Sequence, residues 1–408
     1  MKILVINTGS SSIKYQLFEM DKQVVLAQGL VERIGEDKSS LVYEVTLDNK
    51  EKRKKVWEGV IPDHRDGFNR IVDLLENDKN GIIRDKSEIS AVGHRVVHGG
   101  EAFKSPVIID ADVIEAIKGN IPLAPLHNPP NLIGIEISLT VFPDSTQVAV
   151  FDTAFHQTLP AHAYLYALPY ELYEKNRVRR YGFHGSSHSY VTEACAEYLN
   201  RPLGDLNLIS IHLGNGASIA AIKNGKCVDT TMGMTPLEGL VMGTRSGDVD
   251  PALPFFLADH LKMSLKEIDI LLNKESGLKG MCGTNDMREV IENKRKGNKH
   301  ADIALNVYTY RIKKYVGAYF AILGGLDALI FTAGIGENSP EIRDMCCRNL
   351  EILGIDIDRD KNNNEEKGIR EIGSTNSKVK IIVIPTNEEL KIALETKKVI
   401  ENQHQVRR

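Results

Sequence analysis

The sequence predicts an α/β protein built from two similar lobes, and a repeated pattern and the length of the chain support this prediction. Residues 208–226 form two β-rich runs around a turn that contains two glycines. Residues 2–18 follow the same plan around a polar turn. A chain of 408 residues also exceeds what one hydrophobic core usually organises. We therefore expect two lobes related by duplication.

Both turns suggest a ligand. A tight turn between two strands exposes backbone N–H groups on a concave bend, and that arrangement suits phosphate oxygens. Taken alone, the Gly-Asn-Gly sequence at 214–216 is more often an ordinary hairpin turn. Two such turns in two similar lobes favour a protein that handles a nucleotide.

The composition excludes several classes of protein. Hydrophobic residues make up 42% and charged residues 26% of the chain, as in soluble globular proteins. A net charge of −4 gives no sign of a nucleic-acid or membrane partner. No apolar run is long enough to span a bilayer, and a β-rich segment stands where a signal peptide would be. The five cysteines lack zinc-ligand spacing, so we expect reduced thiols and a cytoplasmic protein.

Two candidate site residues follow β-rich runs in the first half of the chain. Arg95 lies between glycines after the run at 89–92, where its planar guanidinium could hold an anion or simply face solvent. Asp152 follows the run at 147–151. The carboxyl end of a strand in an open α/β sheet commonly carries catalytic groups, although aspartate also starts many loops.

Two further candidates lie in the second half. His184 precedes the helical pattern at 189–199, and a helix N-terminus attracts anions. His188, nearby, faces either solvent or core. Arg245 is a second arginine flanked by glycines. Two arginines in different halves could hold a transferring phosphoryl group from both sides.

Four further segments have clear patterns. We expect a hairpin at 41–57 with its turn near 48–50, and an amphipathic helix at 301–323 that serves as core or subunit interface. A strand at 328–332 should lead into a glycine loop at 334–338, with Ser339 and Pro340 starting a helix. Thr386 and Glu389 have the spacing of a capping box, which leaves Glu388 as the better Mg²⁺ carboxylate.

Eight motifs in order carry a family resemblance over nearly the whole chain. They are NTGSSSIK at 7–14, GHRVVHGG at 93–100, FDTAFHQTLP at 151–160, YGFHGSSH at 181–188, HLGNG at 212–216, MGTRSGDVDP at 242–251, GIGEN at 334–338 and PTNEE at 385–389. With these motifs the chain resembles the acetate kinases, which belong to the acetate and sugar kinase, heat-shock protein and actin superfamily.

The resemblance implies a duplicated, ribonuclease-H-like fold of the actin-like ATPase type with an interdomain active-site cleft. Residues 1–150 and 386–408 would form the lobe for acetate and metal, and residues 151–385 the lobe for the nucleotide and a dimer interface. The implied reaction is ATP plus acetate giving ADP plus acetyl phosphate, reversibly. It also implies Mg²⁺, with Mn²⁺ as a substitute, and a homodimer without nucleic-acid or membrane partners.

The resemblance also assigns roles at matching positions. The catalytic positions are Arg95, Asp152, His184 and Arg245, and the metal ligands are Asn7 and Glu388. Arg95 would also hold acetate, with Val97, Leu126, Phe183 and Pro236 around its methyl group. The nucleotide positions are Lys14, His212, Leu213, Gly214, Asn215, Gly216, Asp286, Met287, Arg288, Gly334, Ile335, Gly336, Glu337 and Asn338. Met287 stands where some relatives carry phenylalanine.

Three other activities remain open from the sequence. A propionate kinase would share every motif and differ in pocket volume. A sugar kinase would need polar pocket residues, whereas the implied pocket is apolar. An actin-like filament ATPase is compatible with the fold, because a fold does not determine a function. Because acetate is already an anion, Asp152 could orient Arg95 or a metal-bound water instead of acting as a base.

Overall fold

The structure is a computed structural model that describes residues 1–46, 51–77 and 82–406. The chain divides into two compact units. Unit 1 contains Met1–Ala154 and Asn387–Arg408, and unit 2 contains Phe155–Thr386. The first boundary falls four residues beyond the one expected at 150, and the second falls one residue beyond the one expected at 385.

Unit 1 contains a mixed sheet of eight strands in the order β5-β4-β3-β2-β1-β6-β8-β7. The strands are β1 Lys2–Thr8, β2 Ser12–Glu19, β3 Val24–Glu32, β4 Ser39–Thr46, β5 Lys52–Gly59, β6 Ile89–Val96, β7 Val107–Ile108 and β8 Thr146–Phe151. From β1 to β5, each strand pairs antiparallel with the next strand in the chain, whereas β6 pairs parallel to both β1 and β8. The β4–β5 hairpin is as expected, and its expected turn near 48–50 lies outside the described residues.

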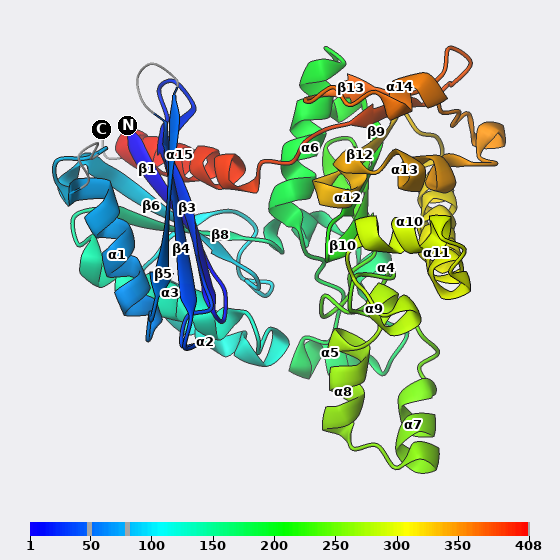
Figure 1. Cartoon of the computed structure of the whole chain (residues 1–408), viewed down its shortest axis with the longest axis horizontal. Coiled ribbons are helices and arrows are strands. Elements are labelled where there is room, and N and C mark those ends of the chain that lie inside the picture. The colour runs from blue at the N-terminus through cyan, green and yellow to red at the C-terminus, as the bar shows by residue number, and fades with distance from the viewer. Residues whose placement is uncertain (47–50, 78–81, 407–408) are drawn as a thin grey trace. The chain divides into compact units, whose positions relative to one another are not determined.

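Helices cover both faces of this sheet. Successive side chains on a strand point to opposite faces, so each strand contributes to two hydrophobic cores. In β1, Leu4 and Ile6 belong to the core under α1 (His64–Asn77) and α3 (Asn128–Val141). Ile3 and Val5 point the other way, into the core under α15 (Glu388–Val406). Helix α2 (Ala111–Gly119) packs beside α3. The last helix therefore completes unit 1, as its red ribbon beside the blue strands shows (Figure 1).

Unit 2 repeats the arrangement of unit 1. Its sheet has the order β11-β10-β9-β12-β14-β13, with β9 Asn207–Leu213, β10 Ala217–Lys223, β11 Lys226–Thr230, β12 Ala328–Thr332, β13 Arg370–Glu371 and β14 Lys380–Val383. Strands β9, β10 and β11 pair antiparallel, and β9, β12 and β14 run parallel. The same pattern relates β1, β2, β3, β6 and β8 in unit 1. This shared strand order matches the duplication predicted from the two turns.

Helices α6 (Gly185–Tyr198) and α11 (Lys299–Leu323) both pack on the sheet of unit 2. Leu305, Tyr308 and Ile312 of α11 are buried within the unit, so this part of the predicted stripe is core. The remaining helices are α4 Ala161–Tyr164, α5 Tyr170–Asn176, α7 Leu253–Leu261, α8 Leu265–Lys274, α9 Gly277–Cys282, α10 Met287–Arg295, α12 Ala333–Asn338, α13 Pro340–Cys347 and α14 Arg359–Asn363. Within the described ranges, no helix combines the length and apolarity needed to cross a membrane.

Two local predictions need correction. The expected glycine loop at 334–338 is the short helix α12, which is followed by the expected Ser339 cap and Pro340 of α13. The last helix begins at Glu388, so Asn387 is its cap, and the Asn387 Oδ1 accepts from the Leu390 N–H at 3.0 Å. The Thr386 hydroxyl instead bonds the Ser187 hydroxyl at 2.8 Å. Glu389 pairs with Lys14, so the predicted capping box is wrong.

Candidate active site

Arg95 and Asp152 lie side by side because β6 and β8 are parallel neighbours. The guanidinium of Arg95 donates from Nε (3.0 Å) and Nη2 (2.6 Å) to Oδ2 of Asp152. The Asp152 side chain is only 2% exposed. Burial alone would lower the pKa of Arg95, but the negative charges of Asp152 and Glu388 outweigh it and raise that pKa. Arg95 therefore remains a cation in a largely dehydrated place.

Glu388 of unit 1 interacts electrostatically with Arg95 and Asp152. Burial raises the pKa of its carboxyl, the cation of Arg95 opposes that shift, and the charges of Asp152 and Glu389 add to it. Asn7 lies near the end of β1, opposite Lys14 of β2. The Lys14 ammonium pairs with Glu389 at 2.5 Å, and Lys14 is the one predicted nucleotide residue that belongs to unit 1.

Asn7 and Glu388 offer oxygen donors, which suit a hard cation such as Mg²⁺ better than zinc. The described residues contain no group of three histidine, cysteine or acidic side chains that could hold a metal by itself. Mg²⁺ commonly keeps several waters and binds through one or two protein oxygens together with substrate phosphates. The donor set therefore fits a metal that arrives with a nucleotide.

The predicted methyl-pocket residues of unit 1 differ in exposure. Val97 is buried, and its N–H donates to Oδ1 of Asn131 at 3.1 Å. The amide of Asn131 in turn donates to the carbonyl of Thr8 at 2.8 Å. Leu126 is exposed. Asn131 was not singled out from the sequence, because its contacts join three segments that are distant along the chain.

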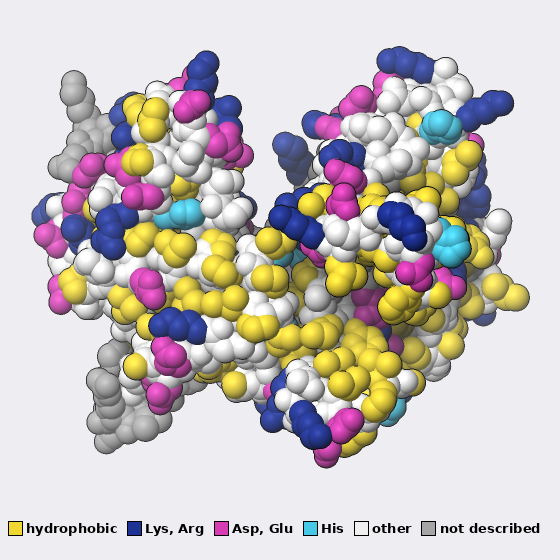
Figure 2. All heavy atoms as spheres, turned by 90° about the horizontal axis from the view of Figure 1, so that it is seen from below, with side chains coloured by type: hydrophobic (Ala, Val, Ile, Leu, Met, Phe, Trp, Pro, Cys, Tyr) yellow, Lys and Arg dark blue, Asp and Glu magenta, His cyan; other side chains and the backbone are white. Residues whose placement is uncertain are grey.

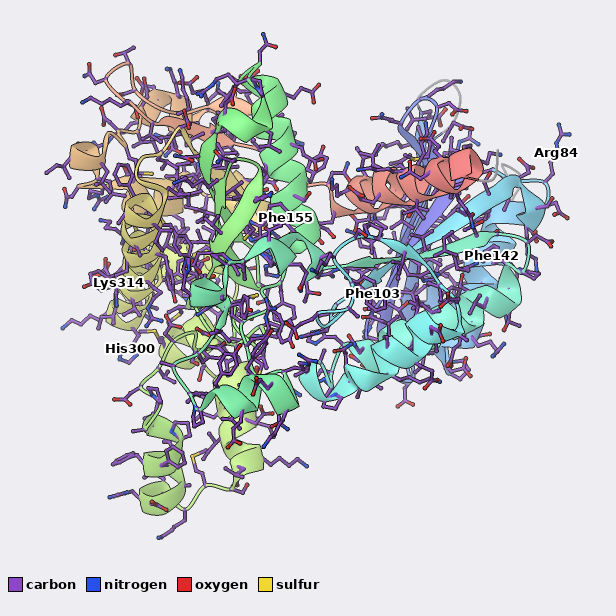
Figure 3. All side chains as sticks on the ribbon, turned by 180° about the vertical axis from the view of Figure 1, so that it is seen from behind. Arg84, Phe103, Phe142, Phe155, His300 and Lys314 are labelled. Atoms are coloured by element: carbon purple, nitrogen blue, oxygen red, sulfur yellow. The ribbon has the colours of Figure 1, made fainter. Side chains whose placement is uncertain are left out.

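A stacked ring pair supports the packing next to Asp152. Phe103, labelled in Figure 3, lies parallel to Phe151 with the ring centroids 4.4 Å apart. Phe151 is the last residue of β8 and precedes Asp152 directly. Phe151 also fills the space where a side chain on Gly99 would lie, since a Cβ there would come within 2.7 Å of its ring. The loop after Val97 therefore requires glycine at this position.

In unit 2, His184 has a constrained backbone and an oriented ring. It is the N-cap of α6, with a left-handed φ of 57° that is uncommon outside glycine. Its Nδ1 lies 2.9 Å from the Ser218 hydroxyl, and its ring stacks on His212 with the centroids 4.2 Å apart. The carbonyl of the buried Phe183 lies 2.8 Å from Nε2 of His156. Together these contacts hold the imidazole in one place.

His184 and Arg245 meet at Gly216, in the turn between β9 and β10. A Cβ on Gly216 would lie 3.3 Å from Nε2 of His184 and 3.7 Å from Nη1 of Arg245. The Arg245 guanidinium approaches the carbonyl of Pro236 at 3.4 Å, and no carboxylate among the described residues pairs with it. Burial lowers the pKa of Arg245. A partly buried cation without an acidic partner, beside bare backbone, is an arrangement that suits an anion.

The predicted nucleotide residues of unit 2 lie in three segments, of which two are joined. Asn215 of the β9–β10 turn accepts at Oδ1 from the amide of Asn285 at 3.0 Å. The next residue, Asp286, caps α10 and pairs with the exposed Arg288, which lowers the pKa of Asp286 to about 2. Met287 is buried.

The third segment is α12, which contains residues 334–338. The guanidinium groups of Arg343 and Arg370 both donate to the backbone carbonyl of Glu337 at 2.9 Å. The side chain of Glu337 accepts from the N–H of Thr386 at 3.1 Å. These bonds hold the short helix at the end of β12, where a parallel sheet commonly binds ligands.

The repeated sheet order makes this a duplicated α/β protein, and the Arg95–Asp152 pair of unit 1 and Arg245 beside a glycine turn of unit 2 suit an enzyme that acts on anions such as phosphoryl groups. The chain belongs to the acetokinase family, which it matches over residues 2–394. It is 54% identical over 403 residues to an acetate kinase from Halothermothrix orenii, covering 98% of this chain and all of that one.

Solved structures agree with this assignment. An acetate kinase from Porphyromonas gingivalis is 48% identical, with a TM-score of 0.92 over 98% of this chain and 99% of that chain. A propionate kinase from Francisella tularensis subsp. tularensis is 46% identical, with a TM-score of 0.90 over the same shares.

Proposed function

We propose that this protein transfers the γ-phosphoryl group of ATP to acetate, giving ADP and acetyl phosphate, and also catalyses the reverse reaction. The observation that carries the proposal is that Arg245, which has no acidic partner among the described residues, approaches the backbone of Gly216 together with Nε2 of His184. Phosphoryl transfer needs little covalent chemistry and much positioning, with cations and N–H donors neutralising the transferring oxygens. His184, Arg245 and the Gly214–Gly216 turn would act on that group, with residues 286–288 and 334–338 holding the rest of the nucleotide.

Arg95 would bind the acetate carboxylate. Asp152 accepts from Nε and Nη2 of Arg95, which leaves Nη1 for an anion. Acetate is ionised at neutral pH, so its oxygen can attack phosphorus without losing a proton. Both bonds to Asp152 favour a role in orienting Arg95 over a role as a general base. Val97, Leu126, Phe183 and Pro236 are the residues we propose around the methyl group.

Asn7 and Glu388 would hold Mg²⁺, for which Mn²⁺ could substitute. When bound, the metal would supply positive charge to the phosphate oxygens. Asn7 offers a neutral amide oxygen and Glu388 a carboxylate whose negative charge favours the cation. Lys14, paired with Glu389, would keep a positive charge beside these ligands for the nucleotide phosphates.

A propionate kinase is the second candidate, because a propionate kinase is nearly as similar in structure as an acetate kinase. The two activities are distinguished by measuring acyl-hydroxamate formation from ATP and Mg²⁺ with acetate, propionate and butyrate. We expect the highest kcat/KM with acetate. A higher value with propionate would make propionate the substrate, and no product with any of the three acids would refute the proposed reaction.

We also propose a homodimer in the cytoplasm. The end of unit 2 that carries α7 and α8 exposes Phe255, Phe256, Leu261 and Leu265, with Leu265 81% exposed. Figure 2 views the molecule from that side and shows hydrophobic side chains there. Exposed apolar clusters commonly mark protein interfaces. Sedimentation should therefore give a dimer, and Phe255→Asp should shift it toward monomer.

Five free cysteines and the need for ATP fit a reducing compartment.

A further inference from the structure

A buried chain of hydrogen bonds runs behind His184 in unit 2. Ser210 of β9, His188 of α6 and Ser218 of β10 are each fully buried. Nδ1 of His188 lies 2.9 Å from the Ser210 hydroxyl, and Nε2 of His188 lies 2.8 Å from the Ser218 hydroxyl. The Ser218 hydroxyl then lies 2.9 Å from Nδ1 of His184. We name Ser210, His188 and Ser218 the Ser–His relay.

Only one direction of donation along the Ser–His relay gives every buried hydroxyl and ring hydrogen an acceptor. In the part of the chain that the structure describes, the Ser210 hydroxyl has one hydrogen-bond partner, His188. A buried hydroxyl hydrogen without an acceptor costs free energy, so Ser210 donates to Nδ1 of His188. Burial, and secondarily His156 and His212, lower the pKa of His188 well below its ordinary value, so the ring is neutral and carries its one proton on Nε2.

The same reasoning extends to His184. Nε2–H of His188 donates to the oxygen of Ser218, and the single hydroxyl hydrogen of Ser218 is then available for Nδ1 of His184. In the opposite direction His184 would donate through Nδ1, and the Ser210 hydrogen would lack an acceptor. We infer that the Ser–His relay fixes the His184 tautomer that carries its proton on Nε2.

This inference deepens the proposed function and rests on it for the role of His184. Nε2 of His184 is the atom that faces Gly216, where Arg245 also approaches. In the fixed tautomer Nε2–H can donate to a phosphoryl oxygen, whereas the other neutral tautomer would present a lone pair to that anion. Ser218 and His188 are therefore positioning residues for the transfer step, since Ser218 bonds Nδ1 of His184 and His188 bonds Ser218.

The test compares ring ¹⁵N NMR spectra of the full-length protein labelled with [¹⁵N]histidine, using His184→Gln to assign the resonances. The variants are Ser218→Ala, which breaks the bond to His184, and Ser210→Ala, which removes the donor at the far end without touching His184. Ser138→Ala is the matched control, because Ser138 is an equally buried serine in unit 1 that bonds Gln147. Ser218→Thr keeps the hydroxyl.

We expect wild type, Ser138→Ala and Ser218→Thr to show the proton of His184 on Nε2. Ser218→Ala and Ser210→Ala should show a mixture of tautomers, with kcat lower by about 10-fold or more and KM little changed, the range for losing an orienting hydrogen bond on a functional histidine. A wild-type resonance in both alanine variants, or in Ser210→Ala alone, would overturn the directional relay. If Ser218→Ala does not fold, Ser210→Ala decides. Wild type without acetate-dependent ADP release refutes the proposed function, while the spectra still test the relay.

Discussion

Replacing Glu388 with glutamine tests the proposed metal site while keeping the size of the side chain. The carboxylate lies in the field of Asp152 and Glu389, and burial raises its pKa. A raised carboxyl pKa means that the charged form is less stable in the folded chain than in water. Removing this charge should therefore not lower the melting temperature. Because Glu388→Gln also removes the charged metal ligand, it should raise the Mg²⁺ concentration for half-maximal activity by about 10-fold or more, the lower end of the losses in metal affinity for changes around a metal site.

The neighbouring residues supply matched controls with the opposite outcome. Glu389→Gln removes the ion pair with Lys14, which is 49% exposed, so we expect a loss of only about 0.2–1 kcal/mol. Asn387→Ala removes the cap of α15 and should cost about 1 kcal/mol. That loss corresponds to a decrease of about 3 °C in melting temperature if unit 1 unfolds by itself. Asn387→Ala should keep the Mg²⁺ dependence of the wild type, and Glu389→Gln, which also removes a charge that raises the pKa of Glu388, should not increase the Mg²⁺ requirement.

The pH dependence gives a second measurement. Mg²⁺ needs the ionised carboxylate, so the Mg²⁺ requirement should fall as pH rises through the raised pKa of Glu388. Between the ordinary and the raised pKa the folded state binds more protons than the unfolded state, so this group lowers stability as pH rises. Both slopes should vanish in Glu388→Gln. A variant with normal Mg²⁺ dependence and a lower melting temperature would refute this reasoning.

Four further substitutions test other parts of the site. Arg95→Ala and Arg245→Ala should each lower kcat on the order of 10³-fold, the scale for losing a guanidinium at a phosphoryl transition state; near-normal turnover would remove that arginine from the mechanism. Val97→Ala should raise kcat/KM for propionate relative to acetate by about 10-fold or more, because an apolar methylene is worth roughly 1–3 kcal/mol; an unchanged ratio would place Val97 in the core. Gly216→Ala should lower kcat, because its Cβ would crowd His184; Gly204→Ala, with open space around it, is the control, and equal activity in both would refute the contact.

Much of the fold is readable from the sequence because local patterns determine it. The two hairpins at 2–18 and 208–226 revealed the duplication, and both sheets have the corresponding strand order. Arg95 and Asp152 were each predicted to follow an apolar run, and Asp152 does follow β8, whereas Arg95 lies inside β6; that the two strands are neighbours is known only from the structure. Ser339 and Pro340 start α13 as predicted, since a cap depends on residues three or four positions away.

Tertiary structure decided what depends on residues far apart in the chain. Thr386 was a plausible cap by spacing, yet its hydroxyl bonds Ser187, 199 positions away, and Asn387 starts the helix instead. His188 was ambiguous between solvent and core until α6 brought it against Ser210 and Ser218. The sequence by itself determined the strands around the two turns, the repeat and the family motifs, because these follow from periodicity and short spacings; β3, β7, β11 and β13 were not predicted. The partners of each buried polar group followed only from the packed fold, because a buried donor must bond whichever acceptor the packing places beside it.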